Sequence, residues 1–88
     1  MTGAETRERS YRGISRRAAL EYFESLGGEV VDDSSVTGDG WEASVEAETV
    51  EIGVSLTLTE VTVRFEGDPG NLDDLVEAFS QKAIRAGG

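Results

Sequence analysis

The residues that could do chemistry are arginines near the N-terminus, carboxylates spread along the chain and a diglycine at the C-terminus. The sequence has no histidine and no cysteine, which excludes thiol nucleophiles, disulfides and the usual zinc sites. Asp73 and Asp74 are adjacent, and adjacent residues of a helix point about 100° apart, so they do not share an acid/base site. An enzyme that uses carboxylates alone, with Mg²⁺, is therefore the weakest functional hypothesis.

Arg12, Arg16 and Arg17 belong to a group of five arginines within the first 17 residues, in a protein of net charge −10. Guanidinium groups bind carboxylates and phosphates, so these arginines could receive such a group from a partner or ligand. Pairing with the protein's own carboxylates is the simpler interpretation, and the 18 acidic residues favour it.

Gly87 and Gly88 end the sequence. Ubiquitin-like modifiers and sulfur carriers present such a diglycine, because an extended tail without side chains can enter the channel of an adenylating enzyme. A helix can also end in glycine, and the preceding residues predict a helix that runs to about Ala86. A carrier that acts through Gly88 is therefore an alternative to a plain helix end.

The element that must position these groups is a long antiparallel hairpin in residues 40–67. Its apolar residues alternate with the period of a strand. A turn at residues 53–55 suits the backbone freedom of Gly53. This turn places apolar residues opposite each other in five pairs: Ile52 with Leu56, Val50 with Leu58, Ala47 with Val61, Val45 with Val63, and Ala43 with Phe65.

Both arms of this hairpin change apolar phase, at residues 48–49 and 59–60, and two interpretations follow. A bulge on each arm would keep one apolar face continuous, and we favour it. Otherwise four tip residues face away from the helices and form a contact patch for another chain: Val50, Ile52, Leu56 and Leu58. Arms of a dozen residues reach on the order of 40 Å, so the tip must curl or project.

Helices are predicted on both sides of the hairpin. The first begins at the N-cap Ser15 and ends at Gly27-Gly28, and the second has Asn71 as N-cap with Asp73 and Asp74 in its first turn. A short strand is expected at residues 29–32, followed by a polar connection, residues 33–40. That connection is similar to a calcium loop, but its twelfth position is Ser44 instead of glutamate, so no metal site is predicted.

The predicted fold is α+β, in the order α-β-β-β-α. An antiparallel three- to four-stranded sheet with a long central hairpin has both helices packed on one face. Residues 1–8 are expected to form a disordered tail and residues 9–88 a single domain, although residues 7–11 could add an edge strand.

The composition limits the class of partner. A net charge of −10 argues against nucleic acid or an anionic membrane as the partner of the whole surface. Seven of the eight basic residues are arginine, and such an acidic, lysine-poor surface is typical of proteins from a salt-saturated cytoplasm. The sequence has neither a signal peptide nor a transmembrane run, so we expect a cytoplasmic protein.

Three segments, YRGISRRAALEYFESLGG, GDGW and LTLTEVTVRFEGDPGNLDDLVEAFSQKAIRAGG, resemble the C-terminal domain of MoaD-related proteins, a family of thermophiles and salt-loving archaea. The resemblance covers about residues 9–88 and is most specific over the last 33. In that family the domain follows a β-grasp domain of the molybdopterin-synthase small-subunit type, whose diglycine carries sulfur. This chain has no room for that domain.

The resemblance implies a setting, molybdenum-cofactor assembly or sulfur transfer, with no catalytic residue and no bound cofactor. The leading hypothesis is therefore a non-enzymatic accessory or interaction domain with a protein partner of unknown identity. The alternative is a sulfur carrier or ubiquitin-like protein modifier that acts through Gly87 and Gly88, and its partner would be an adenylating enzyme.

Overall fold

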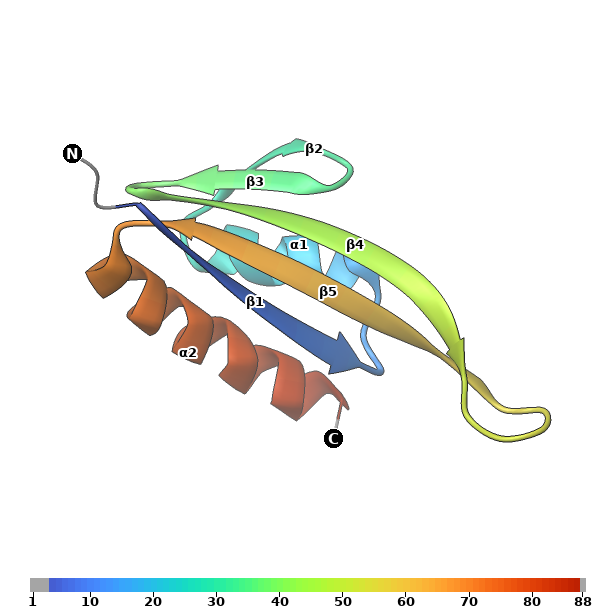
Figure 1. Ribbon diagram of the computed structural model, residues 1–88. Coiled ribbons are helices and arrows are strands. Elements are labelled where there is room, and N and C mark those ends of the chain that lie inside the picture. The colour runs from blue at the N-terminus through green and yellow to red at the C-terminus, as the bar shows by residue number, and fades with distance from the viewer. Residues whose placement is uncertain (1–3, 88) are drawn as a thin grey trace.

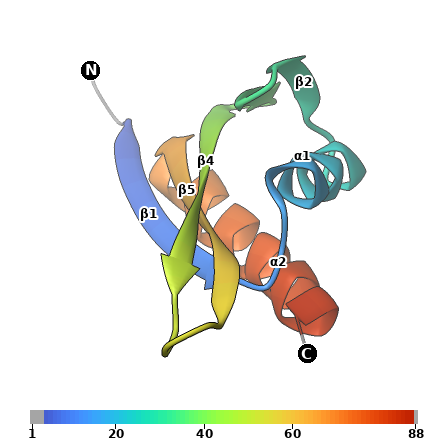
Figure 2. The ribbon, with the colours of Figure 1, turned by 90° about the vertical axis from the view of Figure 1, so that its right-hand side faces the viewer.

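A five-stranded antiparallel sheet forms the frame of the protein, and two helices cover one of its faces (Figures 1 and 2). The computed structural model describes residues 4–87. The strand order in the sheet is β1-β5-β4-β3-β2. The elements in chain order are β1 (Glu5–Arg12), α1 (Arg16–Ser25), β2 (Glu29–Asp32), β3 (Ser35–Gly38), β4 (Trp41–Glu51), β5 (Thr57–Gly67) and α2 (Pro69–Gly87).

The N-terminal strand β1 is the edge strand that residues 7–11 were expected to add, and it is longer than predicted. It pairs with β5 along all of its residues, from Glu5 opposite Gly67 to Arg12 opposite Glu60. It therefore begins before residue 7 and includes residues 5–8, which the sequence assigned to a disordered tail. Backbone hydrogen bonds to β5 hold a segment whose polar side chains carry no strand signal. Residues 1–3 of the predicted tail lie outside the described residues.

The strand that was not predicted is β3, which lies within the predicted polar connection. Its single large apolar residue, Val36, is buried against the core. The turn before it is closed by the Asp32 side chain, whose Oδ1 accepts the Ser34 backbone N–H at 2.9 Å. The α+β class and the antiparallel sheet are thus confirmed, but the sheet has five strands instead of three to four.

The central hairpin has the predicted register. Pairing is continuous from Trp41 opposite Gly67 to Glu51 opposite Thr57. At the turn the Ile52 N–H donates to the Leu56 carbonyl at 2.7 Å, and Gly53 has a positive φ of 92°.

The favoured bulge interpretation of this hairpin is wrong, because the ladder of β4 and β5 has no register shift. Side chains alternate between the two faces of a strand, so Val50 lies on the opposite face from Val45. The inner face needs apolar residues only where helices cover it. Beyond that point the inward-facing Ala47 is exposed, and the apolar pattern moves to the other face.

The first helix, α1, begins and ends as predicted. Ser15 is its N-cap, and the Ser15 Oγ accepts the Ala18 N–H at 3.0 Å. After the helix, Gly27 has a φ of 96°, and the Gly28 N–H returns to the Phe23 carbonyl at 2.9 Å.

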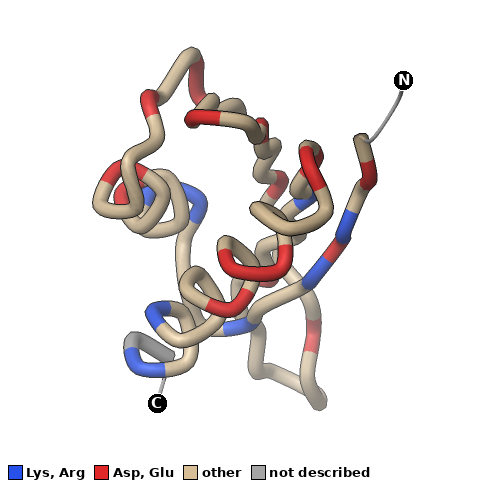
Figure 3. Tube along the Cα trace, turned by 90° about the vertical axis from the view of Figure 1, so that its left-hand side faces the viewer, with Lys and Arg blue, Asp and Glu red and all other residues tan. Residues whose placement is uncertain are grey.

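The second helix, α2, begins earlier than predicted. It starts at Pro69, and the Leu72 N–H already donates to the Asp68 carbonyl at 2.9 Å, so Asn71 is not the N-cap. Proline suits the first helical position because its φ is fixed and its missing N–H needs no partner there. Figure 3 shows acidic residues along the first half of α2 and cationic residues at its C-terminal end.

The hydrophobic core lies between the sheet and the two helices, and aromatic rings form its centre. The rings of Phe23 in α1 and Phe79 in α2 stack at 4.5 Å between centroids, and Phe65 of β5 meets each of them at 5.7 Å. All three side chains are fully buried, and burial of each large apolar side chain contributes about 1.5–3 kcal/mol. This packing holds both helices on one face of the sheet.

The molecule measures 49 × 23 × 21 Å, and the hairpin of β4 and β5 lies along its long axis (Figure 1). Neither of the helices that the structure describes is long and apolar enough to cross a membrane.

Candidate functional site

The tip of the hairpin carries exposed apolar side chains and extends past both helices (Figure 1). The exposed fractions are 36% for Ile52, 106% for Val54 and 58% for Leu56. These are three of the five large apolar side chains that are exposed within residues 4–87. Apolar area exposed in this way gains free energy when another surface covers it. We call Val50, Ile52, Val54, Leu56 and Leu58 the tip patch.

The register explains the direction of the tip patch. Val50 and Leu58 are opposite each other, and their side chains share the sheet face that the helices do not cover, because the residues of the core occupy the alternate positions. Both are only partly buried. The tip patch is therefore continuous with the open face of the sheet.

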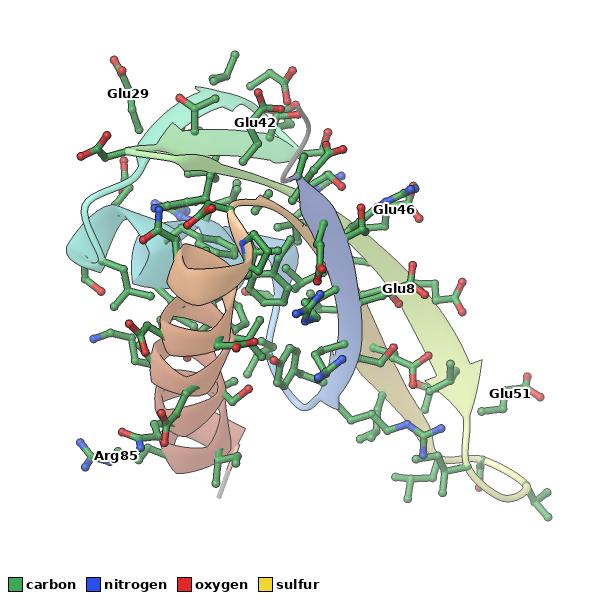
Figure 4. All side chains as sticks on the ribbon, turned by 60° about the vertical axis from the view of Figure 1, so that its left-hand side comes forward. Glu8, Glu29, Glu42, Glu46, Glu51 and Arg85 are labelled. Atoms are coloured by element: carbon green, nitrogen blue, oxygen red, sulfur yellow. The ribbon has the colours of Figure 1, made fainter. Side chains whose placement is uncertain are left out.

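The open face of the sheet is strongly acidic. Glu8 and Glu46 lie on the side of the sheet away from α2 (Figure 4). Two of the cross-strand pairs on this face place glutamates directly opposite each other: Glu42 with Glu66, and Glu48 with Glu60. Like charges in this position destabilise a hairpin. A cationic partner would relieve that repulsion.

The arginines singled out in the sequence lie on different elements. The Arg12 Nε, at the end of β1, is 3.1 Å from the Glu60 carboxylate. In the first turn of α1, the Arg17 Nε is 3.6 Å from Glu21. For these two residues, pairing with the protein's own carboxylates is confirmed. Such exposed pairs contribute little to stability, so they leave both guanidinium groups free to exchange partners.

Arg16 has a different environment. It lines a groove of about 370 Å³ together with Ser34, in the turn between β2 and β3, and with Glu46 and Glu48 of β4. Within residues 4–87 it makes no ion pair shorter than 4.0 Å.

The groove adjoins an edge of β4 that the sequence did not predict. β3 pairs with β4 only from Trp41 to Ser44, and the Val45 N–H makes one further bond to the Ser34 carbonyl at 2.8 Å. Residues 46–51 pair with β5 on one side, and no other described strand pairs with them. We call these six residues the β4 edge.

The turn at residues 32–34 sets the point where β3 begins and so where the β4 edge starts. The hydrogen bond from the Ser34 N–H lowers the pKa of the Asp32 carboxyl. Sequence periodicity gave no signal for the β4 edge, because the edge depends on the length of a neighbouring strand that was itself not predicted.

The first glycine of the C-terminal diglycine lies at the end of α2. The backbone of Gly87 is part of the helix, and Gly88 lies outside the described residues. An extended tail of carrier type would require the last turn of α2 to unwind. Lys82 and Arg85 lie near that end of the helix, in its last two turns.

Comparison with known proteins gives one family. The model of the family described as archaeal MoaD-like protein matches residues 7–88, which is nearly the whole chain. A search of curated proteins finds no match. The matched residues include the tip patch, the β4 edge and both helices.

Proposed function

Because the chain belongs to the archaeal MoaD-like protein family, we propose that it is a non-enzymatic interaction domain in molybdenum-cofactor assembly or sulfur transfer. The observation that carries this proposal is the tip patch. Its most exposed residues, Ile52, Val54 and Leu56, lie at or beside the turn, where polar residues would suffice to reverse the chain.

Two further features support a role in binding. The arms of the hairpin are continuously paired as far as Glu51 and Thr57, so the tip patch is held out on a regular element. Ordered presentation lowers the entropy that binding costs. Arg12, Arg16 and Arg17 lie at the junction of β1 and α1, and we include them as residues that would contact acidic groups of the partner.

Site-specific photo-crosslinking in the native host tests this function. A photoreactive phenylalanine analogue in place of Val54 should give a discrete adduct of higher mass, because Val54 is fully exposed at the centre of the tip patch. The same analogue in place of Glu77, an exposed residue of α2, is the control and should give none.

The substitution Leu56→Asp should abolish the Val54 adduct while far-ultraviolet circular dichroism stays unchanged, because Leu56 is largely exposed and contributes little to the core. Adducts of equal yield at positions 54 and 77, or an adduct that persists with Leu56→Asp, would rule out the tip patch as the binding surface.

The second candidate function is a sulfur carrier or ubiquitin-like modifier, and the diglycine together with the family favours it. Here Gly87 and Gly88 would be the reacting tail, and an adenylating enzyme would activate its carboxylate. Mass spectrometry of the protein from its native host distinguishes the two functions. A carrier should show a thiocarboxylate at Gly88 or a link from Gly88 to lysines, should keep it with Leu56→Asp and should lose it when Gly88 is deleted.

A further inference from the structure

We propose that the β4 edge binds an extended basic segment of the partner protein, which adds to the sheet as a sixth strand beside β4. This inference rests on the proposed interaction function and specifies the chemistry of the partner. It is carried by three features of residues 46–51: the direction of their backbone groups, the open space beside them and their charge.

The backbone groups of the β4 edge are directed toward the open side. The Val45 N–H donates to Ser34 at 2.8 Å, and the groups of a strand alternate between its two sides. Ala47 and Thr49 therefore direct their N–H and C=O groups to the side of β3. Ile52, three residues after Thr49, bonds to the β5 side through Leu56. An edge with regularly spaced unpaired groups is a template for an added strand.

Space for the added strand exists in the direct continuation of β3. The groove of about 370 Å³ is lined by Val45 to Glu48 of β4, reaches Ser34 at one end and extends over the open face to Thr62 of β5. On the helix side of the β4 edge, the side chains of Ala47 and Thr49 are small, and Glu51 follows on the same side next to the turn. At about 3.3 Å per residue, the β4 edge accommodates a segment of roughly six residues.

The carboxylates beside the β4 edge favour a basic segment as the added strand. Glu46 and Glu48 project from the open face, and Glu48 is opposite Glu60 in the ladder. A lysine or arginine of the added strand beside Glu46 or Glu48 would therefore meet a carboxylate on the same face. Arg16 lines the groove from the helix side, so the alternate residues of the segment should be small or acidic. Near the tip, a residue beside Val50 should be apolar.

A second copy of the chain fits the β4 edge less well. In a two-fold antiparallel arrangement centred on Glu48, that residue would be opposite its own copy. If the two-fold axis passed through Ala47 instead, Glu46 of each copy would be opposite Glu48 of the other copy. Both arrangements place like charges together, and every arrangement, including one centred on Thr49, brings together two molecules of net charge −10.

The test uses the whole chain and a capped peptide, Val-Ser-Lys-Ser-Lys-Ser, observed by amide chemical shifts. In low salt the largest shifts should fall in residues 46–51 and at Ser34. A peptide with glutamate in place of both lysines should not bind. N-methylation should abolish binding when it is placed on the amides that face the β4 edge, whereas methylation of the alternate amides should be tolerated, because only the first set bonds to β4.

Matched variants of the protein complete the test. The pair Glu46→Gln and Glu48→Gln should weaken peptide binding at least tenfold. The pair Glu42→Gln and Glu66→Gln removes the same charge from the part of the open face that β3 already borders, and it should change the affinity less than threefold. Ala47→Pro removes one N–H group of the β4 edge to which no described strand bonds. This substitution should abolish binding of the peptide.

Three results would overturn the proposal: no peptide binding at low salt, shifts centred away from residues 46–51, or equal effects of the two glutamine pairs. A dimer of the free protein that the peptide does not dissociate would assign the edge to a second copy. The crosslink from position 54 tests the interaction function separately, since it depends on the tip patch and needs no peptide. A crosslink without peptide binding would leave the interaction function standing and reject only the basic segment.

Discussion

Among single residues, Tyr11 joins the edge strand β1 to α2. Its hydroxyl is 2.8 Å from the Ser80 Oγ, and its ring centroid is 5.2 Å from that of Phe79. Burial raises the pKa of the Tyr11 phenol above its ordinary value of 10.0. Unfolding exposes the phenol, so in alkaline solution the unfolded chain loses this proton first. The stability that Tyr11 contributes is therefore complete below pH 10.0 and is lost as pH rises toward the folded pKa.

We expect Tyr11→Phe to lower the free energy of unfolding by about 0.5–1.5 kcal/mol at neutral pH, because it removes one hydrogen bond. It should also flatten the fall in stability above pH 10.0, since the group that titrates is absent. Urea unfolding at neutral pH and at several alkaline values measures both effects. Tyr22→Phe is the control, and an unchanged alkaline slope in Tyr11→Phe would contradict the prediction.

Among the elements, the hairpin of β4 and β5 shows what the sequence can and cannot predict. Apolar residues on both arms match in one register only, so the pairing could be predicted. The bulge could not be judged from the sequence, because the phase change at residues 48–49 depends on how far the helices cover the sheet. In the folded chain the helices stop covering the inner face of the sheet before the exposed Ala47, and the tip patch lies on the open face.

The other elements show the same limit. β3 was missed because Val36 is its only large apolar residue and turn-forming residues surround it. The tip residues of the candidate site were identified from their phase, which is a local property. The β4 edge could not be identified in this way, because an unpaired edge arises where two neighbouring strands differ in length, which is not a local property of either strand. The start of α2 was misplaced because Asn71 and Pro69 are both helix-start signals.

The charge pattern of the hairpin gives a second prediction. Glu48 is opposite Glu60, whose carboxylate also binds Arg12. Glu48→Lys replaces repulsion with attraction and should raise the free energy of unfolding by about 0.2–1 kcal/mol. Glu46→Lys is a matched control, because Glu46 is opposite the neutral Thr62. A urea midpoint that rises no more for Glu48→Lys than for Glu46→Lys would contradict the role of this cross-strand pair.

At the scale of the whole molecule, the net charge of −10 opposes compaction. Salt screens such repulsion over a length of about 10 Å at 0.1 M and about 3 Å at 1 M. We expect the urea midpoint to rise as KCl increases from low to molar concentration, and to rise less in the variant with Glu42→Gln and Glu66→Gln. An equal amount of sucrose controls for general solute effects, and a midpoint independent of KCl would show that repulsion is already balanced in the folded chain.

The long axis of 49 Å has a consequence for how this family can diversify. Within β4 and β5 the buried core ends at Val45 and Val61, so the sequence between them is free of the packing that determines the fold. Substitutions there can change the choice of partner at little cost in folding. The distal hairpin is thus an exchangeable module, and an engineer could graft a different recognition loop between residues 50 and 58 and keep the scaffold intact.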